Sequence, residues 1–314
     1  MKFGLLFSGQ GAQRAGMGID FLADPLFKET VEIASEASGQ DIVADFKSEH
    51  DELKKTVHVQ PALVAFEAGI YRMLQRDLPD FNAAGMVGLS LGEYGAMIAS
   101  KAISLKEGIS LVSDRAKYMQ EDADQVSSSM AALIKPDVDK VNAILTALQN
   151  TDQQVYFSNF NSPKQIVIGG EESAVKKAVQ EINDQEAAKR AVELKVNGAF
   201  HTPLFNEASK KMHQRLANVS FAQVEIPVIS NTTVKPFTDD WAEIMERQLA
   251  VPTHFGSCVQ YLIDQVGIDA TLEIGPGKTL SSFARQVDRK LEHYHIGNLT
   301  DYQKFIEEEH GIKK

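Results

Sequence analysis

Short apolar runs alternate with stretches of helical periodicity along most of this chain. The runs at 2–7, 83–87 and 270–274 have the length of buried strands. Between them, apolar side chains recur every three or four positions, which is the spacing of one helix face. The clearest stripe lies in a helix predicted over 107–121 and consists of Ile109, Val112, Ala116 and Met119. Strands that alternate with helices favour an α/β fold with a mostly parallel sheet under helical cover.

Glycine and proline indicate where several predicted helices begin or end. We expect the helical spacing over 21–46 to end at Gly39, and a further helix to open at Gln60-Pro61, because proline suits a first turn.

We expect the charged segment from Asp301 onward to be a solvated face or a frayed end. The other elements predicted in this part of the chain are helices over 94–100, 204–216 and 241–248 and a strand over 228–230.

The pattern changes over 130–196, where strands and helices follow in the order β-α-β-β-α-β. That order is typical of a split, ferredoxin-like unit. A polar, serine-rich stretch at 122–129 precedes it and is the expected hinge. We therefore predict a small domain over 127–196, inserted into a large α/β domain made of 1–126 and 197–314. The predicted elements are strands at 130–134, 155–160, 165–168 and 190–196 and helices at 138–148 and, led in by Gly169-Gly170, at 171–186.

Composition and charge narrow the class of protein. The net charge of −11 disfavours non-specific nucleic-acid binding, which needs basic surface to replace phosphate counterions. A single cysteine, Cys258, excludes an internal disulfide framework, fits a reducing compartment and is best interpreted as a small core residue. The first apolar run is too short for a signal peptide, and no run approaches membrane-spanning length. We expect a soluble, cytoplasmic protein.

The segment Gly88-Leu89-Ser90-Leu91-Gly92 lies between a predicted strand and a predicted helix. A serine flanked in this way is typical of a nucleophile elbow, since the strained turn leaves room only for glycine two positions before and after it. The turn exposes the serine Oγ, and the helix that follows directs its N–H groups at the same place. The sequence therefore predicts a nucleophilic serine.

A glycine-rich loop, Ser8-Gly9-Gln10-Gly11-Ala12-Gln13, follows the first strand. It fails the dinucleotide-binding pattern, because Arg14 stands where the third glycine is needed. Gly277-Lys278-Thr279 resembles the end of a phosphate-binding loop, but Leu272 replaces its first glycine. The remaining use for the first loop is a close backbone approach with a free N–H donor.

Two further residues allow more than one interpretation. Arg115 lies at the edge of the apolar stripe, where an arginine often only extends its charge to the surface. His201 lies at a loop-to-helix junction just after the small domain, where clefts form, although a lone histidine is often structural.

Taken together and in order, these segments resemble the malonyl-CoA:acyl carrier protein transacylases of fatty acid synthesis along the whole chain. The resemblance implies a large α/β-hydrolase-like domain with an inserted ferredoxin-like domain. The matching segments are Phe7-Ser8-Gly9-Gln10-Gly11-Ala12-Gln13, Gln60-Pro61-Ala62-Leu63, Gly88-Leu89-Ser90-Leu91-Gly92-Glu93-Tyr94, Arg115 with Met119, Asn159-Phe160-Asn161-Ser162-Pro163, Gly198-Ala199-Phe200-His201, Gln248-Leu249 and Glu273-Ile274-Gly275-Pro276-Gly277.

The resemblance also implies catalytic roles. Ser90 would be the nucleophile, and His201 the general base and later the general acid. The backbone N–H groups of Gln10 and Leu91 would form the oxyanion hole, and the backbone carbonyl of Gln248 would orient the histidine. Many relatives have histidine immediately before the serine, where this chain has Leu89, so His201 must carry the proton here.

Substrate recognition is implied in the same way. Arg115 would hold the free carboxylate of the malonyl group, and Phe200 would crowd the carbon between its two carbonyls. No cofactor and no metal are implied, and no metal-ligand spacing occurs in the sequence. The other residues that we expect to contact substrate are Met119, Asn159, Asn161, Gln60 and Asn231.

The expected partners are malonyl-CoA and an acidic acyl carrier protein, and we expect a monomer. Lys189, Arg190 and Lys195 form a candidate basic patch for the carrier, or are ordinary solvated side chains. A free-standing acyltransferase of a polyketide pathway is a close alternative. A serine hydrolase is less favoured, since it would need an acid between serine and histidine in chain order. A non-catalytic binding module would not need Ser90, His201 and the Gln10 loop together.

Overall fold

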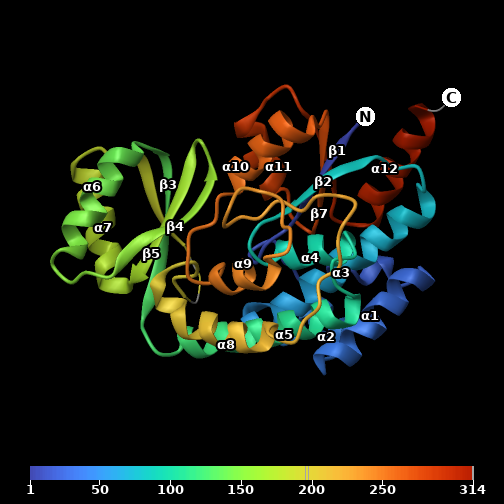
Figure 1. Ribbon diagram of the computed structural model, residues 1–314, viewed down its shortest axis with the longest axis horizontal. Coiled ribbons are helices and arrows are strands. Elements are labelled where there is room, and N and C mark those ends of the chain that lie inside the picture. Colours follow the sequence, from blue (N-terminus) through green and yellow to red (C-terminus); the bar gives the residue numbers. More distant parts are fainter. Residues whose placement is uncertain (195, 197, 313–314) are drawn as a thin grey trace.

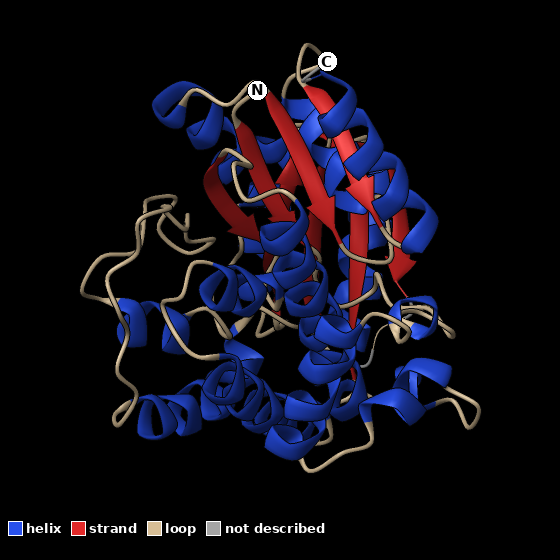
Figure 2. Cartoon of the chain, turned by 90° about the vertical axis from the view of Figure 1, so that its right-hand side faces the viewer, coloured by secondary structure: helices blue, strands red, loops and turns tan. Residues whose placement is uncertain are grey.

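The computed structural model describes residues 1–194, 196 and 198–312 and contains two sheets (Figure 1). The larger sheet has the strand order β2-β1-β7-β8, and all three of its strand pairs are parallel. Figure 2 shows these strands side by side with helices around them. The strands are β1 (Phe3–Phe7), β2 (Ala83–Gly88), β7 (Ala270–Ile274) and β8 (Glu292–Ile296).

Alternate residues of β1 belong to two separate apolar layers, because successive side chains of a strand point to opposite faces. Phe3, Leu5 and Phe7 belong to the larger cluster, which includes most of the helices, whereas Leu6 belongs to a second cluster with Phe255 and other side chains of the C-terminal part. Both faces are therefore covered, as the mostly apolar sequence of the strand predicts. The helices on the first side include α1 (Pro25–Ser38), α2 (Ile42–Lys47), α3 (Thr56–Asp77), α4 (Gly92–Ala99), α5 (Leu105–Ala123), α8 (Asn206–Leu216) and α9 (Trp241–Arg247), and those on the second are α10 (Phe255–Tyr261) and α11 (Thr279–Val287).

The smaller sheet is antiparallel and has the strand order β4-β5-β3-β6. Its elements follow as β-α-β-β-α-β between Ser128 and Leu194, as predicted; the exact domain limits remain a prediction. Several predicted bounds differ from the structure by a few residues, and Gly169 and Gly170 lie in a strand instead of leading into the helix. Position 170 needs glycine, because a Cβ there would stand 2.0 Å from the backbone oxygen of Gln154 on the neighbouring chain segment. The elements are β3 (Ser128–Pro136), α6 (Val138–Gln149), β4 (Val155–Ser162), β5 (Gln165–Glu171), α7 (Glu172–Asp184) and β6 (Ala188–Leu194).

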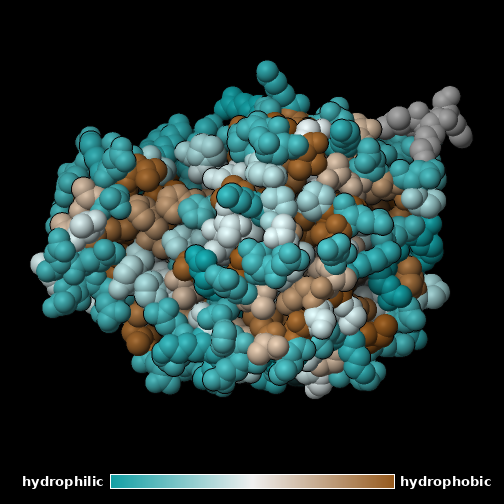
Figure 3. Space-filling model, viewed as in Figure 1, coloured by the Kyte–Doolittle hydropathy of each residue, from teal (hydrophilic) through white to brown (hydrophobic). Residues whose placement is uncertain are grey.

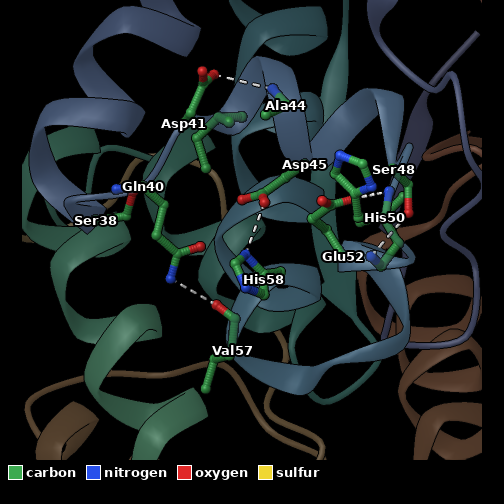
Figure 4. Close-up of polar contacts among 12 residues, drawn as sticks. Ser38, Gln40, Asp41, Ala44, Asp45, Ser48, His50, Glu52, Val57 and His58 are labelled. Carbon is green, nitrogen blue, oxygen red and sulfur yellow. Dashed lines mark hydrogen bonds and ion pairs between the residues drawn. The ribbon is translucent and has the colours of Figure 1, made fainter.

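The start of α3 also differs from the prediction. The helix begins at Thr56, so Pro61 lies in its interior and cannot donate a hydrogen bond to the carbonyl of Val57. The side chain of Gln40 replaces that donor, with Nε2 3.0 Å from the Val57 oxygen (Figure 4). The proline is tolerated because a neighbouring segment satisfies the carbonyl that it leaves free.

Two further predictions fail. Instead of the strand predicted over 228–230, Val228 and Ile229 form isolated bridges, Val228 with Met86 and Ile229 with Pro236. The charged C-terminal segment is the helix α12 (Leu299–Ile312), which buries Phe305 against the ring of Phe3 at a centroid distance of 5.8 Å.

Within the described residues, no helix is both long enough and apolar enough to cross a membrane. Figure 3 shows one face of the molecule, where hydrophilic residues dominate and hydrophobic ones are scattered among them. That distribution is ordinary for a protein surface in water.

Candidate active site

A cavity of about 800 Å³ lies where residues of the two sheets meet. It contains the predicted nucleophile, base and arginine together, although these come from distant parts of the chain. Its lining includes Gln10, Ser90, Leu91, Arg115 and His201, together with Met119, Met130, Asn159, Asn161, Val167 and Phe200.

Ser90 occupies the sharp turn between β2 and α4. Its φ of 55° lies in the left-handed region, which a non-glycine residue adopts at a cost. The flanking glycines are required by close contacts: a Cβ at Gly88 would stand 1.9 Å from the carbonyl carbon of Gly92, and one at Gly92 2.1 Å from the oxygen of Phe7. The local structure is the elbow that the motif predicts.

His201 contacts the serine directly. Its Nε2 lies 2.7 Å from Ser90 Oγ, and its Nδ1 lies 2.7 Å from the backbone oxygen of Gln248. Since a carbonyl can only accept, Nδ1 must carry a proton and the neutral ring accepts through Nε2. Burial and then the charge of Arg115 lower the pKa of His201 to about 4. At neutral pH the ring is therefore uncharged and can remove the serine proton.

The Arg115 side chain is buried in the site, with 1% exposure, so the interpretation as a surface arginine is wrong. Its Nη1 donates to Gln60 Oε1 at 2.8 Å, and its Nη2 donates to Ser90 Oγ and Gln248 Oε1, both at 3.0 Å. The guanidinium carbon also lies 5.7 Å from the centre of the Tyr94 ring. Among the described residues it forms no ion pair, so a buried cation faces the cavity with only neutral partners.

Gln10 and Leu91 both line the cavity, and the backbone N–H of neither donates to an acceptor in the described part of the chain. The loop that carries Gln10 approaches the elbow closely, since a Cβ at Gly9 would stand 2.6 Å from the oxygen of Leu89. The Gln10 side chain is held by Thr56 Oγ1, which accepts from its Nε2 at 3.2 Å. Gly9 therefore allows the loop to approach the elbow closely, as the sequence suggested.

The predicted substrate contacts divide into two groups. Met119, Asn159, Asn161 and Phe200 line the cavity. Gln60 and Asn231 do not; both have 0% exposure and lie behind it.

These two buried amides support the site instead. Gln60 holds Arg115, as described above. The Oδ1 of Asn231 accepts the Ser90 N–H at 2.9 Å, and its Nδ2 donates to the Gly88 oxygen at 2.8 Å. Asn231 therefore fixes the backbone of the elbow on both sides of the turn.

The candidate basic patch is described only in part. Lys189 and Arg190 are exposed on β6, an edge strand of the small sheet. Lys195 lies outside the described residues.

Cys258 is buried, and its Sγ donates to the oxygen of Ser230 at 3.2 Å, as expected of a core residue. Across the described ranges, no group of three or more His, Cys, Asp and Glu side chains is placed to hold a metal.

Sequence reasoning gave no role to Glu93 or to the side chain of Gln248. Glu93 stands in the serine motif, but an acidic residue in a first helical turn is usually solvated. Here it is fully buried, and both its oxygens accept hydrogen bonds, from the Asn231 N–H and from Gln248 Nε2.

Comparison with known proteins gives a consistent result. Residues 5–296 match a family described as an acyl transferase domain. A relative from Bacillus subtilis (strain 168), named malonyl CoA-acyl carrier protein transacylase, is 32% identical over 297 residues, which is 93% of this chain and 92% of the relative.

Solved structures agree with the sequence comparison. The malonyl CoA-acyl carrier protein transacylase of Clostridium perfringens has a TM-score of 0.93 and 32% identity, and the match covers 100% of this chain and 98% of that one. A malonyl-transacylase solved in complex with a type II PKS acyl-carrier protein has a TM-score of 0.92 and 31% identity, with coverage of 98% and 100%. These similarities confirm the predicted fold class and the resemblance stated from the sequence.

Proposed function

Because this chain belongs to the acyl transferase domain family, we propose that it transfers the malonyl group of malonyl-CoA to the phosphopantetheine thiol of acyl carrier protein, for fatty acid synthesis. The observation that carries the proposal is the position of Ser90 Oγ, 2.7 Å from His201 Nε2 and 3.0 Å from Arg115 Nη2. A nucleophile, its base and a cation for the substrate carboxylate thus meet at one oxygen.

In the first half-reaction, Ser90 Oγ attacks the thioester carbonyl while His201 Nε2 accepts the hydroxyl proton. The negative charge moves to the carbonyl oxygen, where the N–H groups of Gln10 and Leu91 donate to it. By analogy with other acyl transfer enzymes, each such donor contributes about 3–4 kcal/mol to the transition state. The carbon–sulfur bond then breaks, and His201 returns the proton to the sulfur of coenzyme A.

The second half-reaction runs the same steps in reverse with a different thiol. His201 removes the proton of the phosphopantetheine thiol, whose sulfur attacks the malonyl-serine ester. The carbon–oxygen bond breaks and Ser90 recovers its proton from His201. A covalent intermediate lets one site serve two large thiol substrates in turn.

Arg115 provides substrate selection in this mechanism. A guanidinium offers two parallel N–H donors to a carboxylate, so a malonyl group would add an anion to the neutral partners of Arg115. An acetyl group would leave the buried cation without an anion. Of the residues that line the cavity, Phe200 is placed next to His201 in the chain and would limit substituents on the central carbon.

The partner of His201 argues against a hydrolase of the serine–histidine–acid type. Such enzymes orient the histidine with a carboxylate, whereas here the acceptor is the backbone oxygen of Gln248. We propose no cofactor and no metal, since the steps above need neither. We also propose that the carrier protein docks with its acidic surface on Lys189 and Arg190, and that the enzyme acts as a monomer.

Intact-mass measurement after incubation with malonyl-CoA, and separately with acetyl-CoA, tests the reaction. We expect a covalent adduct with malonyl-CoA that is absent in Ser90→Ala and that disappears when holo acyl carrier protein is added. Loss of the adduct to water instead of to the carrier would support a hydrolase.

The same experiment separates the two pathways. One structural relative was solved with a type II PKS acyl-carrier protein, so a polyketide carrier is a specific alternative acceptor. We expect faster discharge by a fatty acid carrier than by a polyketide carrier at equal concentration, and the opposite order would assign the enzyme to the second pathway.

A further inference from the structure

The carboxyl group of Glu93 lies beneath the active site with 0% exposure, three residues after the nucleophile. Its Oε1 accepts the backbone N–H of Asn231 at 2.5 Å, and its Oε2 accepts from Gln248 Nε2. The mechanism above gives this group no chemical step. A buried carboxyl is costly unless its hydrogen bonds serve the structure around it.

The side chain of Gln248 connects Glu93 to the reacting groups. Its Nε2 also donates to the backbone oxygen of Ser90 at 2.9 Å, and its Oε1 accepts from Arg115 Nη2 at 3.0 Å. The backbone oxygen of the same residue orients His201. One residue thus contacts the serine, the histidine and the arginine.

We propose that Glu93 is a positioning residue that fixes the Gln248 amide with its oxygen toward Arg115, and so sets the preference of the site for a malonyl over an acetyl group. This inference rests on the proposed function. Glu93 touches neither the substrate nor the reacting atoms, and it acts through Gln248.

The two ends of the Gln248 amide have nearly the same shape and opposite hydrogen-bonding character. In the observed orientation the NH₂ end faces two acceptors, Glu93 and the Ser90 oxygen, and the oxygen faces a donor, Arg115. The flipped orientation would set N–H against N–H at Arg115 and oxygen against oxygen at Glu93. An ionised carboxylate, which can only accept, therefore selects one orientation.

Burial raises the pKa of Glu93 to about 7, while its hydrogen bonds and the charge of Arg115 act in the opposite direction. Above that pH Glu93 is an anion, and the Gln248 amide lies between it and the buried guanidinium of Arg115, which has no ion pair among the described residues. The guanidinium is thereby held where a substrate carboxylate can reach it.

Glu93→Gln keeps the shape of the side chain and removes one of its two acceptors. The remaining oxygen can satisfy the Asn231 N–H or Gln248 Nε2, but not both, and the new NH₂ group favours the flipped Gln248 amide. Arg115 then loses its acceptor. We expect the rate of malonyl loading to fall about 10- to 100-fold, the range for a hydrogen bond to a charged group, with a smaller loss for acetyl loading.

The test measures acylation of Ser90 by malonyl-CoA and by acetyl-CoA in single turnovers at about pH 8, where Glu93 is ionised. The variants are Glu93→Gln, Gln248→Leu and the two combined. We expect each single change to lower the malonyl-to-acetyl ratio, and the double variant to have the same ratio as Gln248→Leu, because the first change acts through the second residue.

Asp122→Asn is the matched control. Asp122 is a buried carboxyl on α5 whose Oδ2 accepts the Ala208 N–H at 2.7 Å, away from the reacting groups. We expect this change to leave the malonyl-to-acetyl ratio at the wild-type value. A structural role of Glu93 alone would give the same result as this control.

Equal losses for both substrates in Glu93→Gln, or effects of the two changes that multiply, would overturn the proposal. If Glu93→Gln does not fold, the proposal can still be tested with Gln248→Leu. An unchanged malonyl-to-acetyl ratio in that variant would also refute the proposal. A wild-type protein that forms no malonyl adduct would instead refute the proposed function.

Discussion

Arg115→Ala offers the sharpest test of how the substrate is chosen. The change removes a guanidinium with 1% exposure and its hydrogen bonds to Gln60, Ser90 and Gln248. A bound malonyl carboxylate would lose two charge-assisted bonds, each worth about 1.5–3 kcal/mol. The sum corresponds to a loss of about 10²- to 10⁴-fold in the rate of malonyl loading.

Acetyl loading should respond differently. An acetyl group offers no carboxylate, so in the wild-type site it leaves the cation of Arg115 without an anion, at a cost of about 2 kcal/mol. Removing the guanidinium removes that cost along with its hydrogen bond to Ser90 Oγ. We expect the rate of acetyl loading to stay within about tenfold of the wild type.

The assay is rapid quenching of single turnovers followed by intact-mass measurement of the acyl-enzyme, with both thioesters at equal concentration. Because any general loss of folded protein lowers both rates alike, the malonyl-to-acetyl ratio isolates recognition of the carboxylate. A ratio that stays at the wild-type value while both rates fall would refute the role given to Arg115.

Four other predictions concern protonation, backbone packing and docking. Because burial lowers the pKa of His201 from its ordinary 6.5 to about 4, the acetyl-loading rate should change little between about pH 7 and pH 5, and a decline centred near pH 6.5 would contradict this. Below pH 6.5 the unfolded chain binds a proton at His201 that the folded chain does not, so urea melts should show the free energy of unfolding of the wild type, relative to that of His201→Gln, decreasing toward pH 4. Gly92→Ala should destabilise the protein in urea melts although helix propensity alone favours alanine by about 1 kcal/mol, since its Cβ would stand 2.1 Å from the oxygen of Phe7; a gain in stability would exclude the clash. Reversing the charge of Lys189 and Arg190 should raise the KM for acyl carrier protein without changing malonyl loading, and an unchanged KM would place the docking surface elsewhere.

The parts of the fold that the sequence predicted are those with a strong local signal. The apolar runs that became β1, β2 and β7 are buried on both faces. Nearly every side chain in them is therefore apolar or small, which makes these strands easy to predict from the sequence. β8 has the sequence Glu-His-Tyr-His-Ile and is half exposed at the sheet edge. Its polar residues give no apolar pattern from which a strand could be predicted. The α12 helix was missed because its charged residues hide the few buried side chains that anchor it, Tyr302 and Phe305.

The residues of the site divide in the same way, into those with a local signal and those without one. Ser90 was identified because its glycines are local in sequence, and His201 and Arg115 because an ordered family pattern contains them. The roles of Asn231, Gln60 and Glu93 depend on partners brought together by folding; the bond from Gln248 to Glu93 spans 155 positions. A local sequence pattern therefore cannot indicate this bond, because its two residues are too far apart in the chain.

That separation along the chain bears on how the enzyme is made. Ser90 acquires His201 only after 111 further residues, and its backbone oxygen acquires Gln248 only after 158. A nascent chain that has just left the ribosome with its elbow complete has neither base nor anchor, and its hydroxyl is then an ordinary alcohol. The serine can therefore be activated only after the chain has been made at least as far as Gln248 and that part has folded onto the elbow.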